Sequence, residues 1–180
     1  MSNATTARRA TAAACEHFDV LIVGAGISGV GAAHHLMEKC PGKRFVILET
    51  KASFGGTWRQ HTYPGIRSDS DLYTFGYRFK PWTGQPIASA GAILDYMGEA
   101  IEQDHLDEHI RYQHEVLTAS WSWQEQLWFI EARNKESGEA VHFSCNFLWM
   151  CQGYYQHAEG YTPQWDGMSD FKGPIVHPQT

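Results

Sequence analysis

The stretch FDVLIVGAGISGVGAAHHLMEKC, residues 18–40, decides the fold of this chain. It opens with a short apolar run that ends in glycines, which is typical of a buried parallel strand. Small and apolar residues then recur at helical spacing up to a Pro-Gly pair at positions 41 and 42. A second apolar run, RFVILE at residues 44–49, follows directly. Strand, helix and strand within about 30 residues indicate a βαβ unit and therefore a parallel sheet.

Three glycines stand between the first strand and the helix in G-x-G-x-x-G spacing: Gly24, Gly26 and Gly29. In this pattern the first glycine permits a tight turn, the second lets the backbone approach a pyrophosphate, and the third lets helix and strand pack closely. The helix that begins near Ile27 and Ser28 presents free N–H groups and a partial positive charge to phosphates. The pattern predicts a Rossmann-type dinucleotide site.

A carboxylate closes the second strand, because Glu49 lies 20 residues after Gly29. At this position an acidic side chain accepts hydrogen bonds from the adenosine ribose hydroxyls and repels a 2′-phosphate. FAD and NAD therefore fit this site, whereas NADP does not. The alternative, in which the glycines serve only tight packing, leaves the carboxylate unexplained.

The next motif separates FAD from NAD. GGTW, which comprises Gly55, Gly56, Thr57 and Trp58, begins six residues after Glu49. Paired glycines let the backbone lie against a cofactor that reaches beyond its adenosine half. An NAD-dependent dehydrogenase needs no second clamp of this kind. The motif therefore favours FAD, and an NAD-dependent dehydrogenase is kept as an alternative.

Beyond this motif the sequence predicts a long ordered loop, a helix and an antiparallel meander. Residues 50–88 are rich in Gly, Pro, Ser and aromatics without a clear period. Residues 89–106 have helical spacing, and Ser89 is a suitable N-cap. Three segments rich in Trp, Phe and Val predict the meander, and a further apolar run predicts a strand that returns to the parallel sheet: 112–123, 127–133, 140–145 and 146–153. The expected fold class is α/β, a Rossmann-type domain with an inserted antiparallel β-meander.

Composition excludes several classes of function. The net charge of −6 gives no basic surface for nucleic acid. No apolar run is long enough to cross a bilayer, so no membrane span is predicted. The four cysteines form no C-x-x-C pair and fit reduced thiols, which predicts a cytoplasmic protein. Ala, Thr and Arg dominate residues 1–16, which predicts a disordered tail.

Several motifs together resemble the class B flavin monooxygenases, and among them the Baeyer–Villiger monooxygenases of the ethionamide-activating subgroup. The matching motifs span nearly all of residues 17–180: GAGISG, Glu49, GGTW, YPGIRSDSD and the F-x-G-x-x-x-H of FKGPIVH. The family signature is F-x-G-x-x-x-H-x-x-x-W, and Phe171, Gly173 and His177 stand in its register. We therefore expect a FAD-binding domain at 17–170, followed at 171–180 by the start of an inter-domain linker that is cut short.

The resemblance implies an enzyme that uses FAD, NADPH and O₂ to oxidise a small ketone or a sulfur-containing substrate. In this family a C4a-peroxyflavin attacks the substrate and yields an ester or a sulfoxide, while the protein positions and protects the flavin. The resemblance also implies that Asp69 lies beside the flavin and orients an arginine, which makes it the expected catalytic residue. Val116 and Gly153 are implied as further cofactor contacts. The alternative for Asp69 is a turn residue that bonds to its own backbone.

Members of this family carry a second G-x-G-x-x-G for NADPH, but no such pattern follows residue 60 here. We therefore expect the NADPH site and the arginine to be missing from these 180 residues. The expected consequences are weakened FAD affinity and no NADPH-driven oxygenation by the chain alone. A non-catalytic FAD-binding fragment is the alternative to an enzyme.

Other groups of side chains are predicted to be structural. His105 and His109 stand four apart on a predicted helix but lack the H-E-x-x-H pattern, so a solvated face is expected rather than a metal site. His34 and His35 are predicted to lie on a helix surface. Alternating tryptophans in the meander predict packing within the sheet: Trp121, Trp123 and Trp128.

Overall fold

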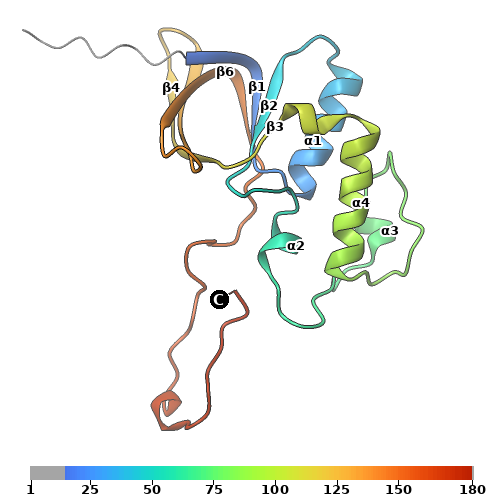
Figure 1. Ribbon diagram of the computed structural model, residues 1–180, viewed down its shortest axis with the longest axis vertical. Coiled ribbons are helices and arrows are strands. Elements are labelled where there is room, and N and C mark those ends of the chain that lie inside the picture. The colour runs from blue at the N-terminus through green and yellow to red at the C-terminus, as the bar shows by residue number, and fades with distance from the viewer. Residues whose placement is uncertain (1–14, 180) are drawn as a thin grey trace, which may run out of the picture.

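The parallel strands predicted around the glycines form the centre of a six-stranded mixed sheet (Figure 1). The computed structural model describes residues 15–179. Strand β1 (Cys15–Val23) pairs in parallel with β2 (Phe45–Leu48) and, on its other side, with β6 (Ala140–Met150). The strand order is β3-β2-β1-β6-β5-β4, and β3 (Ile110–Arg111) is parallel to β2. The predicted βαβ unit is confirmed. Strand β3 was not predicted, because a strand of two residues shows no periodicity.

The N-terminal boundary differs from the prediction. Cys15 and Glu16 belong to β1 and pair with His142 and Phe143 of β6, so the predicted tail at 1–16 is wrong for its last two residues. Residues 1–14 of that prediction lie outside the described part of the chain. The polar start of β1 carries no apolar alternation, which is why the sequence pattern placed the boundary too late.

Two helices cover one face of the parallel strands (Figure 1). Helix α1 (Ile27–Lys39) and helix α4 (Ala90–Gln103) share a core with β1 and β2 whose central members are fully buried: Ile22, Val30, Ala33, Ile47, Ile93 and Met97. The Ser89 hydroxyl accepts a hydrogen bond from the Ala92 N–H, as predicted for the N-cap of α4. The helix ends at Gln103, three residues before the predicted end, because His105 adopts a left-handed φ of 52° and starts the 3₁₀ turn η1 (Leu106–His109).

The predicted meander is present, but its last strand and the predicted returning strand are one strand. Strands β4 (His114–Ser122) and β5 (Leu127–Asn134) are antiparallel, and β5 pairs with β6 only up to Cys145. The remainder of β6 continues beside β1 to Met150. No turn residue other than Asn146 separates the two halves, so the backbone stays extended. The meander is therefore continuous with the parallel sheet and encloses its own small core around Phe18, Ile130 and Phe143.

The tryptophans of the meander differ in their packing. Trp121 and Trp128 face each other across β4 and β5, with ring centroids 5.6 Å apart, as predicted for sheet packing. Trp123 lies just beyond β4 and is 85% exposed, and its ring packs edge-on against Trp121 with centroids 5.8 Å apart.

The long loop at 50–88 is ordered, as predicted, and contains two single-turn helices. These are α2 (Thr57–Gln60) and α3 (Leu72–Phe75). The loop is tied to both covering helices, because the Tyr77 hydroxyl donates to the Ile27 carbonyl and the Tyr77 ring stacks on Tyr96 of α4. Helices of four residues are too short to produce a recognisable sequence period.

After β6 the chain leaves the body of the fold as an extended excursion (Figure 1). Residues 151–179 are mostly exposed, and their regular structure is the 3₁₀ turn η2 (Met168–Asp170). The predicted bounds at 170 and 171 remain predictions. Within residues 15–179, no helix is long and apolar enough to cross a membrane.

Candidate functional site

Two of the three fingerprint glycines are required by the packing of the chain itself. Gly24 has φ of +101°, its N–H donates to the Leu48 carbonyl, and a Cβ there would lie 2.7 Å from the Cys151 carbonyl oxygen. A Cβ on Gly29 would lie 1.9 Å from the Gly24 carbonyl oxygen. The tight turn and the close contact of helix and loop predicted for these glycines are thus both present.

Gly26 is different, because the described residues around it do not require a glycine. Its φ of −78° is ordinary, and a Cβ would meet Gly56 Cα at an unstrained 3.7 Å. The residue is the N-cap of α1, provides no side-chain cap, and precedes a first turn without acidic residues. The partial positive charge of this 13-residue helix is therefore not offset by its own first turn. An open backbone at such a position suits a phosphate group that approaches from outside the chain.

Glu49 lies directly against this loop and is 7% exposed. One carboxylate oxygen accepts from the Ala25 N–H at 2.8 Å, and the other accepts from the Lys51 N–H at 2.9 Å. These bonds hold the glycine loop against the end of β2, a role that the sequence did not indicate. Each oxygen keeps a further lone pair, so the ribose contact predicted for Glu49 stays chemically possible.

The paired glycines sit on the fingerprint loop, as expected of a second clamp. The Gly55 N–H donates to the Ala25 carbonyl, and both glycines have positive φ, +127° and +52°. A Cβ on Gly56 would come within 3.1 Å of Gly26 Cα. Thr57 then begins α2, and the Trp58 ring packs edge-on against Phe75. The two motifs, whose second glycines at 26 and 56 are 30 positions apart, thus form one backbone surface.

Lys51 and Gln60 extend this surface and were missed by the sequence patterns. The Lys51 ammonium donates to the Gln60 side chain, and partial burial lowers the pKa of Lys51. The only sequence signal would have been the position of Lys51 two residues after the acid.

Asp69 lies in an exposed turn. The turn is held by its neighbours, since the buried Ser68 hydroxyl donates to the Ser70 carbonyl at 2.6 Å and accepts from the Ser70 N–H at 3.1 Å. The Ser70 hydroxyl approaches the Asp69 carboxylate at 3.4 Å. The structure thus shows Asp69 as an exposed residue of this turn, and the catalytic role of Asp69 stays a prediction.

An aromatic group from two segments surrounds this turn. A hydrogen bond with Tyr154 raises the pKa of Tyr155, and burial and the negative charge of Asp69 add to the rise. The Tyr155 ring also packs edge-on against His61, which lies at the end of α2. The Nδ1 atom of His61 is buried and has no hydrogen-bond partner among the described residues. A buried ring nitrogen without a partner is typical of a place where a ligand or water completes the bonding.

Gly153 lies in the segment that packs against the glycine loop, and Val116 lies on β4. Gly153 has φ of +75° and follows Gln152, whose Cα lies 3.4 Å from the Cβ position of Gly24. Val116 pairs with Ala132, just before a β-bulge, on the strand whose first N–H bonds to the Glu49 carbonyl. Their cofactor contacts remain predictions.

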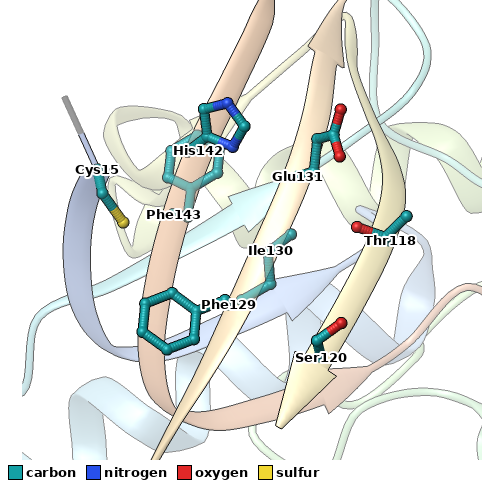
Figure 2. A pocket seen from close by; sticks show the side chains of 8 residues that line it. All are labelled: Cys15, Thr118, Ser120, Phe129, Ile130, Glu131, His142 and Phe143. Carbon is teal, nitrogen blue, oxygen red and sulfur yellow. The ribbon is translucent and has the colours of Figure 1, made fainter. Parts of the chain in front are cut away.

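A separate cavity of about 460 Å³ lies on the meander and the start of β1 (Figure 2). Figure 2 shows Cys15, His142, Glu131 and Thr118 in a row across four neighbouring strands, which agrees with their strand register. None of the fingerprint residues lines this cavity. It offers neither glycine backbone nor a helix N-terminus, so it is not the expected nucleotide site.

Comparison with known proteins relates the chain to a Rossmann-like family model and to FAD-containing monooxygenases. Residues 22–83 match the family model of an NAD(P)-binding Rossmann-like domain. The chain is 51% identical over 165 residues to the FAD-containing monooxygenase EthA of Mycobacterium tuberculosis, a match that covers 91% of this chain and 33% of the relative. The chain thus spans about a third of the length of the curated relatives it matches.

Solved structures agree in fold. A steroid monooxygenase bound to NADP is 28% identical, with a TM-score of 0.72 over 91% of this chain and 31% of its own. OTEMO in complex with FAD and NADP is 26% identical, with a TM-score of 0.71 over 92% of this chain and 31% of its own. By sequence and fold, this chain therefore corresponds to the N-terminal portion of the EthA-like, FAD-containing class B flavin monooxygenases.

Proposed function

We propose that this chain binds FAD, as the FAD-binding part of an NADPH- and O₂-dependent flavin monooxygenase. The observation that carries the proposal is the open backbone at Gly26, which lies at the first turn of α1, beside Glu49 and against Gly56. A pyrophosphate at a helix N-terminus is the ligand that fits such a place. The choice of FAD is supported by the FAD-containing relative and by the OTEMO complex.

Each predicted residue has a role in this proposal. The loop of Gly24, Gly26 and Gly29, with Ile27 and Ser28 after it, holds the pyrophosphate. Glu49 binds the ribose with the lone pairs that remain beside its two backbone hydrogen bonds. The remaining contacts follow the cofactor away from its adenosine half: Gly56, Thr57, Trp58, Asp69, Val116 and Gly153.

FAD, when bound, supplies the oxygen-transfer chemistry, and the residues of this chain bind and orient it. Asp69 is proposed to hold a cationic side chain near the flavin, because it is exposed on a turn that Ser68 and Ser70 fix by two hydrogen bonds. These 180 residues hold one G-x-G-x-x-G, so NADPH would require a second site that they do not supply. A small ketone or a sulfur-containing compound is proposed as substrate from the family resemblance.

An NAD-binding domain is the second candidate. The family model that matches residues 22–83 describes NAD(P)-binding domains, and the fingerprint with Glu49 suits NAD as well as FAD. FAD is preferred because the relative EthA is FAD-containing and because the paired glycines at 55 and 56 add a second glycine surface against Gly26.

The test is a comparison of ligands on the purified 180-residue chain. We expect FAD to co-elute with the protein and to raise its melting temperature, whereas NAD⁺ at the same concentration does not. At a hundredfold excess over Kd, binding adds about 2.7 kcal/mol to the free energy of unfolding. Stabilisation by NAD⁺ but not by FAD would favour the second candidate, and no effect of either would contradict both. The chain with FAD, NADPH and a ketone is expected to form no product.

A further inference from the structure

A group of metal-binding side chains lies on α1, on the half away from the glycine loop. His34, His35 and Glu38 read H-H-x-x-E along the helix. One ligand atom of each lies within 4.8 Å of the others. The Glu38 Oε2 atom is 3.5 Å from His35 Nδ1 and 4.0 Å from His34 Nε2. The three side chains therefore converge on one point beside the helix.

His34 was predicted to lie on a helix surface, but only 15% of its side chain is exposed. Its ring is stacked on Phe79, with centroids 3.4 Å apart and planes 11° from parallel. Its Nδ1 atom lies 2.6 Å from the carboxylate of Asp104, the C-cap residue of α4. The carboxylate and the stacked ring fix the imidazole, and they leave Nε2 as the atom that faces Glu38.

This arrangement has the parts of a metal site with an outer carboxylate. A ligating histidine usually donates its other ring N–H to a carboxylate, which fixes the tautomer and makes the free nitrogen a better ligand. Zinc ligands at about 2.1 Å in tetrahedral geometry lie about 3.4 Å from one another. The observed separations of 3.5 and 4.0 Å are close to that value before any adjustment of side chains.

The charge around the group is mixed. Lys39 donates to Glu38 Oε1 at 2.9 Å, which lowers the pKa of the Glu38 carboxyl and leaves Oε2 facing the histidines. The Lys39 ammonium also opposes a cation, so we expect moderate affinity. His35 and Glu38 are about half exposed, so an ion can reach the site from solvent.

We propose that His34, His35 and Glu38 bind a divalent transition-metal ion of the class that imidazole prefers, such as Zn²⁺, and that Asp104 positions His34. The ion would strengthen the connection between α1 and the end of α4. The proposal is independent of FAD binding, since the group lies at the other end of α1. The pair considered from sequence lies elsewhere, because His105 is in a left-handed turn before η1 and His109 stacks on Phe45.

The test is titration of the metal-stripped chain with Zn²⁺ alone by calorimetry. We expect one ion per chain with a micromolar Kd. His35→Ala, at an exposed position, should weaken binding at least about tenfold, and Asp104→Asn should weaken it about 10- to 100-fold. His109→Ala and Cys40→Ser are the matched controls and should leave the affinity unchanged. A melting curve without metal checks that each variant is folded.

Cobalt identifies the donor atoms independently. The Co²⁺-loaded chain should show the weak visible bands of nitrogen and oxygen coordination and no sulfur-to-metal charge-transfer band. The proposal is overturned if His35→Ala binds Zn²⁺ as the parent chain does, or if a charge-transfer band appears and Cys40→Ser removes it. Absence of any Zn²⁺ binding at millimolar concentration would equally overturn it. The hydrogen bond between His34 and Asp104 would then serve only to connect α1 with the end of α4.

Discussion

The two ends of the proposed cofactor site are built differently. At the glycine end, the backbone of residues 24–29, Glu49 and the paired glycines bond to one another, and most of the contacts are buried. At the Asp69 end, an exposed turn and exposed aromatics meet a buried His61 nitrogen that has no hydrogen-bond partner within residues 15–179. The first end is complete within these residues, whereas the second offers groups that still need a partner. This difference predicts that mutations at the first end affect folding, except at Gly26 where a side chain has room, and that mutations at the second end do not.

The largest effect is expected from Gly29→Ala. The added Cβ would lie 1.9 Å from the Gly24 carbonyl oxygen, and a backbone atom cannot give way as a flexible side chain can. We expect a loss of about 3 kcal/mol or more in the free energy of unfolding. Urea unfolding followed by circular dichroism measures it. Gly91→Ala in α4 is the matched control, because the added Cβ would meet only a hydroxyl at 4.0 Å and should be tolerated. Gly42→Ala is unsuitable as a control, because Gly42 has positive φ. Equal stability of the parent chain and Gly29→Ala would refute the described loop.

A smaller loss is expected from Glu49→Gln. The carboxylate accepts from two backbone N–H groups, whereas an amide can offer one oxygen and must turn its NH₂ group toward the other donor. We expect the free energy of unfolding to fall by about 2 kcal/mol. Glu136→Gln, at an exposed turn position, is the matched control and should change little. An unchanged Glu49→Gln variant would mean that the carboxylate does not hold the loop.

Cysteine labelling distinguishes the buried glycine end from the exterior without any substitution. Cys151 lies against Gly24, and burial raises the pKa of its thiol, so a smaller fraction is thiolate at pH 8. We expect Cys151 to react with iodoacetamide several-fold more slowly than the exposed Cys40, as followed by peptide mass spectrometry. Raising the pH toward 10 should reduce the difference in labelling rate between Cys151 and Cys40. Faster labelling of Cys151 than of Cys40 would argue against the burial of this end.

The smallest effect is expected from Asp69→Asn. Asp69 is exposed, and the turn around it is held by Ser68, so the free energy of unfolding should change by less than about 0.5 kcal/mol. Asp71→Asn is the control two residues away. It makes the same change at a residue whose carboxylate caps α3 by accepting from the Thr74 N–H. Replacement of Asp71 by Ala, which removes the cap altogether, should cost about 1 kcal/mol. A large destabilisation by Asp69→Asn would show that the residue has a structural role in the turn.

The sequence predicted the glycine end well, because its requirements are local. Positive φ at Gly24, the helix at Ile27 and the acid at the end of β2 each follow from short spacings. The parts that were missed depend on contacts between distant segments. The hydrogen bond from Ala25 to Glu49, the continuity of β6 from β5 to β1, and the group of His34, His35 and Glu38 with Asp104 can be seen only once the chain is folded. Asp69 came from family resemblance, and its turn alone would not have indicated a function.

The most direct test of the account is FAD affinity in Gly26→Ala. The new methyl group would meet the chain at an unstrained 3.7 Å, so the variant should stay folded, with a loss of at most about 1 kcal/mol because alanine is a poorer N-cap than glycine. The same methyl group would occupy the space that the pyrophosphate needs, so the Kd for FAD, measured by flavin fluorescence titration, should rise at least about tenfold. A Gly26→Ala chain that stays folded and binds FAD as tightly as the parent chain would contradict the proposed site.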